Sequence, residues 1–173
     1  MTQTPPDRTP AARLVDELAR DFAPAERTVP AMLARQAERY AEKPLVSSGG
    51  HSWTYSQARD EAARFGATLR AAGIERGDRV ALICSNRLDF LRVFLGCAWI
   101  GAVSVPLQTS SSASSLLPIV AETEPVLIAT SVTFVADAVE PAVGGPAPAR
   151  IVVFDHHEQV DDERDAIAAA RTA

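Results

Sequence analysis

The polar segment 109–115 comes nearest to a phosphate-binding loop. Its serine and threonine hydroxyls precede an expected helix, and hydroxyls beside a helix N-terminus can bind phosphate. The segment has neither a glycine, which would let the backbone approach an anion, nor a lysine. The sequence also lacks the Gly-x-x-x-x-Gly-Lys-Ser/Thr and Gly-x-Gly-x-x-Gly patterns. A solvated polar loop is therefore the favoured interpretation.

The histidines form one cluster, at the end of an expected strand. His156, His157 and Glu158 are consecutive, and neighbours in an extended segment point to opposite faces, which makes a poor metal chelate. Asp155 stands where α/β folds place ligands, but a loop cap is the favoured role. His51 has no acid or nucleophile near it in sequence and is interpreted as structural.

The remaining candidates also favour structural roles. Ser85 and Asn86 follow an expected strand, but no Gly-x-Ser-x-Gly surrounds them, so helix capping is favoured. Cys84 and Cys97 lie in apolar runs and are predicted to be free buried thiols. Lys43 is the only lysine. No residue is assigned a catalytic, cofactor-binding or metal-binding role.

Composition indicates a soluble protein of ordinary character. The chain has 173 residues, 47% of them hydrophobic and 23% charged, enough for one domain with a core. Its net charge of −5 includes no basic run, which argues against nucleic acid or an anionic membrane as partner. The first ten residues lack an apolar signal core and no stretch is long enough to span a membrane, so a cytoplasmic location is expected.

The elements that would position these residues alternate between helix and strand. Helices are predicted at 11–22, 28–41, 54–73, 85–101, 114–123, 132–143 and 161–172. Strands are predicted at 45–47, 51–54, 79–84, 102–106, 126–129 and 151–154. The clearest signal is the pair Thr54 and Gln57, a capping box before an apolar helical stripe that Gly73 ends.

The alternation from residue 79 onward predicts an α/β fold with a mostly parallel sheet and flanking helices. Residues 1–27 are interpreted as a leader with a short helix. Residues 28–173 are interpreted as one partial domain, whose N-terminal elements lie against the sheet or begin a neighbouring layer.

Three segments resemble motifs of the adenylate-forming (AMP-binding) superfamily. Residues 53–58 (Trp-Thr-Tyr-Ser-Gln-Ala) resemble its Leu-Thr-Tyr-x-Glu-Leu motif, with Trp, Gln and Ala as departures. Residues 76–86 resemble its Gly-Asp-Arg-Val-Ala strand and the Asn that follows. Residues 96–107 resemble the next motif, which ends in Gly-Ala-Val-x-Val-Pro-Leu. The order of elements from Thr28 onward also resembles the family, so the resemblance covers about 80 residues in the right order.

The nearest resemblance changes along the chain. Residues 27–102 are most similar to acyl-CoA ligases, and residues 101–173 to the adenylation domain of carboxylic acid reductases. The short connection before residue 53 departs from the reductase pattern. A divergent reductase, a hybrid gene and a fused reading frame each fit this mixture.

The resemblance implies the chemistry of a complete enzyme. ATP with Mg²⁺ and a small-molecule carboxylate give acyl-AMP, and coenzyme A or a phosphopantetheine thiol accepts the acyl group. A reductase then uses NADPH to release an aldehyde. The family's phosphate loop, ribose-binding aspartate and catalytic lysine match no position here, so the chain is expected to bind no cofactor and to be inactive alone. A partner could be the remainder of the domain; the alternative is a non-catalytic interaction or regulatory module.

Overall fold

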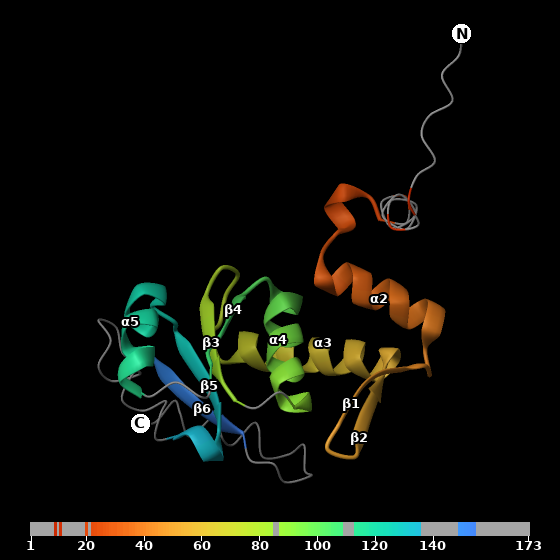
Figure 1. The fold of residues 1–173 in the computed structure, drawn as a ribbon. Helices are drawn as coiled ribbons and strands as arrows, with labels where there is room; N and C mark the ends of the chain where they lie inside the picture. Colours follow the sequence, from red (N-terminus) through yellow and green to blue (C-terminus); the bar gives the residue numbers. More distant parts are fainter. Residues whose placement is uncertain are drawn as a thin grey trace.

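The computed structural model describes residues 22–84, 87–108, 113–135 and 149–154, with residues 9, 11 and 20 (Figure 1). The helices are α2 (Val29–Tyr40), α3 (Tyr55–Ala71), α4 (Leu88–Ile100), α5 (Ala113–Thr123) and the 3-10 turns η1 (Pro24–Glu26) and η2 (Val132–Phe134). The strands are β1 (Pro44–Ser48), β2 (His51–Thr54), β3 (Arg79–Ile83), β4 (Val103–Pro106), β5 (Leu127–Ser131) and β6 (Arg150–Phe154). The predicted helix at 161–172, and most of those at 11–22 and 132–143, fall outside the described residues.

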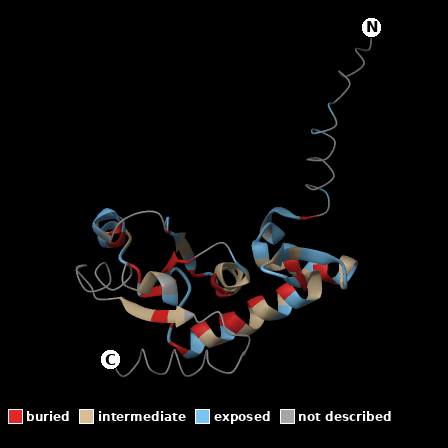
Figure 2. Ribbon diagram, turned by 60° about the horizontal axis from the view of Figure 1, so that its bottom comes forward, coloured by how far each residue is buried: buried red, intermediate tan, exposed pale blue. Residues whose placement is uncertain are grey.

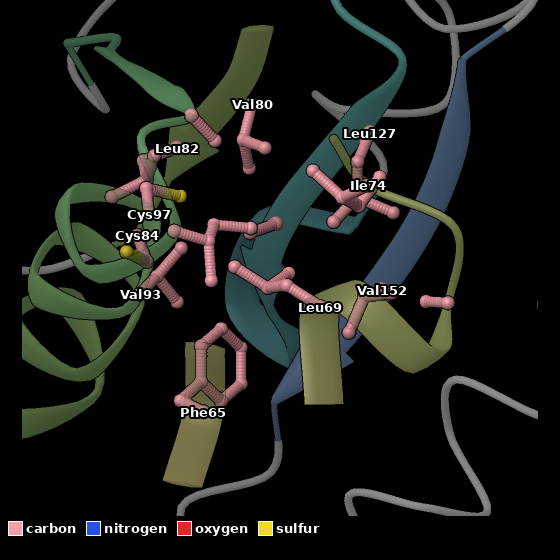
Figure 3. Close-up of a cluster of buried hydrophobic side chains, with 14 residues drawn as sticks. Phe65, Leu69, Ile74, Val80, Leu82, Cys84, Val93, Cys97, Leu127 and Val152 are labelled. Atoms are coloured by element: carbon pink, nitrogen blue, oxygen red, sulfur yellow. The ribbon is translucent and has the colours of Figure 1, made fainter. Parts of the chain in front are cut away.

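The main sheet confirms the predicted α/β class. Four strands pair in parallel in the order β4-β3-β5-β6. Helices α3 and α4 cover one face, where Phe65, Leu69, Val93 and Cys97 meet side chains of β3 and β5 (Figure 3). Helix α5 covers the other face with Leu116 and Val120. Because both faces are covered, β3 and β5 are continuous apolar runs, as parallel strands require.

A second, smaller sheet lies on the other side of α3 and α4. Strands β1 and β2 form an antiparallel hairpin, and its turn residues Gly49 and Gly50 have φ of +60° and +84°. Only glycine adopts such values at little cost, which explains the Gly-Gly pair. A separate apolar cluster that includes Leu33 of α2, Trp53 of β2 and Ala62 of α3 joins the hairpin to the helices. The N-terminal elements therefore begin a neighbouring layer, one of the two arrangements expected.

Local signals fix most helix ends. Thr54 Oγ1 accepts from the Gln57 N–H at 3.2 Å, and the Gln57 side chain accepts from the Thr54 N–H at 2.9 Å, which confirms the capping box. Thr28 caps α2 in the same way at 3.3 Å. Gly73, at φ +81°, follows α3 as predicted.

The predicted cap of α4 is wrong. The helix begins at Leu88 with Arg87 as its N-cap, and Arg87 makes no side-chain capping bond. The predicted caps Ser85 and Asn86 lie outside the described residues. Asp89 in the first turn places a negative charge at the positive end of the helix, which partly replaces a side-chain cap.

Helices α3 and α4 cross closely because each has a glycine at the contact. A Cβ built on Gly96 would lie 2.7 Å from Cδ1 and 3.1 Å from Cβ of Phe65. A Cβ on Gly66 would lie 3.2 Å from the Gly96 carbonyl oxygen. Buried residues accordingly recur along α3 and the central strands (Figure 2).

We expect Gly96→Val to lower the free energy of unfolding by about 1–3 kcal/mol, because the new side chain has to displace the buried Phe65 ring. The measurement is urea denaturation followed by circular dichroism. Ala98→Val is the matched control, since it adds a similar β-branched group to the same helix on the side away from α3. Helix propensity favours Val over Gly but Ala over Val, so a Gly96→Val variant as stable as the wild type would show that the crossing does not set the cost.

Candidate functional site

Most of the candidates from the sequence lie outside the described residues, and the two described ones, His51 and Lys43, stand apart. Residues 109–112 of the serine-rich loop, Ser85, Asn86 and the segment 155–158 lie outside the described residues. His51 is exposed at the turn end of the hairpin, where it pairs with Ser48. Lys43 is exposed near the opposite end, with Nζ 5.1 Å from the centre of the Tyr40 ring. The only lysine therefore lies just before β1 of the hairpin and not on a strand of the parallel sheet.

The carboxyl ends of β3 and β5 are where a parallel sheet most often places a ligand. Thr130 Oγ1 is buried there and donates to the Ile83 carbonyl at 2.8 Å, which ties the two strand ends together. The next residue, Ser131, is 1% exposed, and its Oγ has no hydrogen-bond partner among the residues that the structure describes. Sequence reasoning missed both hydroxyls, since Ser and Thr at the end of an apolar run read as loop residues.

Cys84 completes the described part of this edge, in surroundings that disfavour its thiolate. Both cysteines are free and buried, as predicted. Burial raises the pKa of Cys84 to about 11, and the nearby Asp89 carboxylate adds to the effect. Burial raises the pKa of Cys97 to about 12. Both groups are neutral thiols near pH 7, and the thiol and hydroxyls at this edge cannot neutralise phosphate charge.

The most developed polar cluster lies between α3 and α4. Glu61 Oε2 accepts from Arg64 Nη2 at 2.6 Å and from Arg92 Nε at 2.9 Å. Arg92 Nη1 also donates to Asp89 at 2.8 Å, and its guanidinium lies 5.5 Å from the Trp53 ring centre. The cluster joins both helices to the hairpin.

The electrostatics of this cluster favour a structural role. Burial by itself raises the pKa of Glu61, but the hydrogen bonds and charges of Arg64 and Arg92 outweigh burial and lower it. A carboxylate held ionised by two arginines is a weak general base and no general acid at neutral pH. The sequence signals the two pairs within a helix, because Glu61 and Arg64 are three residues apart, as are Asp89 and Arg92. Nothing in the sequence signals the bond between the helices, from Arg92 to Glu61.

The described residues provide no metal site. They contain no group of three or more His, Cys, Asp or Glu side chains placed to hold an ion. Within the same residues, no helix combines the length and apolar character needed to cross a membrane.

Comparisons with known proteins identify relatives. The model of the AMP-binding enzyme family matches residues 33–172. The carboxylic acid reductase of Mycobacterium marinum is 49% identical over 98 residues, which are 57% of this chain and 8% of that protein. The long-chain-fatty-acid–CoA ligase FadD13 of Mycobacterium tuberculosis is 45% identical over 60 residues, which are 35% of this chain and 12% of that protein.

Solved structures show the same fold at low identity. The anthranilate CoA ligase AuaEII, in complex with anthranoyl-AMP, has a TM-score of 0.72 at 19% identity, over 89% of this chain and 28% of that one. A benzoate CoA ligase of Burkholderia xenovorans has a TM-score of 0.69 at 21% identity, over 81% of this chain and 28% of that one. The chain thus spans a small part of the relatives that it resembles.

We expect the two thiols to resist alkylation at pH 8 in the native protein, because burial blocks the reagent and the raised pKa values leave little thiolate. Iodoacetamide labelling followed by mass spectrometry should show modification of Cys84 and Cys97 accelerating about 100-fold or more in 6 M guanidinium, because unfolding exposes both thiols and removes the burial that raises their pKa values. Rapid labelling of Cys84 in the native protein would contradict its description as a buried, neutral thiol.

Glu61 should contribute stability that disappears in acid. Because its folded pKa is lowered from the usual 4.5, its contribution is present above pH 4.5 and is lost as the pH falls through the folded value. At pH 7 we expect Glu61→Gln to cost about 1–2 kcal/mol in urea denaturation, since a partly exposed charged network is lost. The difference between wild type and variant should shrink below pH 4. The exposed Glu38→Gln is the matched control, and a pH-independent difference at Glu61 would contradict the assignment.

Proposed function

The chain belongs to the AMP-binding enzyme family, and we propose that it is the N-terminal part of an acyl-activating enzyme that is inactive by itself. Two observations support the proposal. The family match covers residues 33–172, and the described residues form an α/β scaffold in which no group of three or more His, Cys, Asp or Glu side chains is placed to hold Mg²⁺.

For the complete enzyme we propose activation of a small-molecule carboxylate as acyl-AMP. Coenzyme A or a carrier-bound phosphopantetheine then takes the acyl group. The similarity to the Mycobacterium marinum carboxylic acid reductase supports a carrier thiol and final reduction with NADPH. The similarity to FadD13 supports release as a coenzyme A thioester. The longer and stronger match favours the reductase.

The described residues do not fit ATP and Mg²⁺. A triphosphate requires several cations or backbone N–H groups around it, and Mg²⁺ prefers carboxylate ligands. At the carboxyl edge, the described residues Cys84, Thr130 and Ser131 are uncharged, and Lys43 lies in the hairpin region instead. We therefore assign no step of the reaction to these residues. Their contribution is to fold the layers against which a catalytic part would be built.

The proposal is tested by exchange of pyrophosphate into ATP that depends on an added carboxylic acid. We expect residues 1–173 alone to give no exchange with a panel of aromatic and aliphatic acids, because the phosphate charge stays uncompensated. The Mycobacterium marinum reductase, also assayed for aldehyde formation with NADPH, is the positive control. A chimera in which residues 28–173 replace the matching part of that reductase should recover exchange.

Each part of the proposal has its own contradicting result. Exchange catalysed by residues 1–173 alone would refute the inactivity. A chimera that folds, judged by a cooperative thermal transition, but gives no exchange would refute the role as the enzyme's N-terminal part. It would favour the alternative of a non-catalytic module.

A further inference from the structure

We draw no further inference here: the strongest candidate, the buried hydroxyl of Ser131 at the carboxyl end of β5, carries nothing because no described residue shows what would bond to it.

Discussion

The close crossing of α3 and α4 determines how the layers of this protein fit together. Gly66 and Gly96 let the two backbones approach, so that Phe65 fills the space beside the crossing. Because the helices are this close, α3 and α4 together can pack against the parallel sheet on one side and against the hairpin on the other. The ion pair between Arg92 and Glu61, 2.9 Å apart, fixes the rotation of one helix against the other. A wider crossing would separate both apolar clusters at once.

The sequence predicted those elements whose signals are local. The Thr54–Gln57 capping box, the Gly49–Gly50 turn and the apolar run of β3 each need only a few neighbouring residues, and the structure confirms all three. The predicted start of α4 was wrong. The Asp89 carboxylate in the first turn takes over part of the role of a capping side chain, and a search for capping residues does not detect this. The strand order β4-β3-β5-β6 could not be predicted from alternation alone, since it depends on which side of β3 the fifth strand joins.

The polar groups also divide into those that the sequence singles out and those whose roles depend on the fold. The sequence singled out histidines, serines and lysine by residue type, although chemical function depends on neighbours in space. Lys43 and His51 stand at opposite ends of one hairpin. Conversely, Thr130 and Glu61 gain their roles from partners 47 and 31 residues away. Contacts of that range follow from the order of the strands and the crossing of the helices, and so become visible only once the fold is known.

The arrangement of polar side chains also explains how the described scaffold can be separate from the residues that carry out a reaction. Some of the described side-chain bonds tie one element to another: Thr130 to β3, Arg92 to α3, and Arg150, at 2.6 Å, to the Ala72 carbonyl just after α3. The charge of Arg92 is neutralised by Glu61 and Asp89 and is not available to a substrate. Catalysis requires the opposite, charged groups whose partner is the reacting molecule. Arg92 and Arg150 hold helices and strands together, and under the proposed function the cations that phosphate needs come from other segments of the complete enzyme.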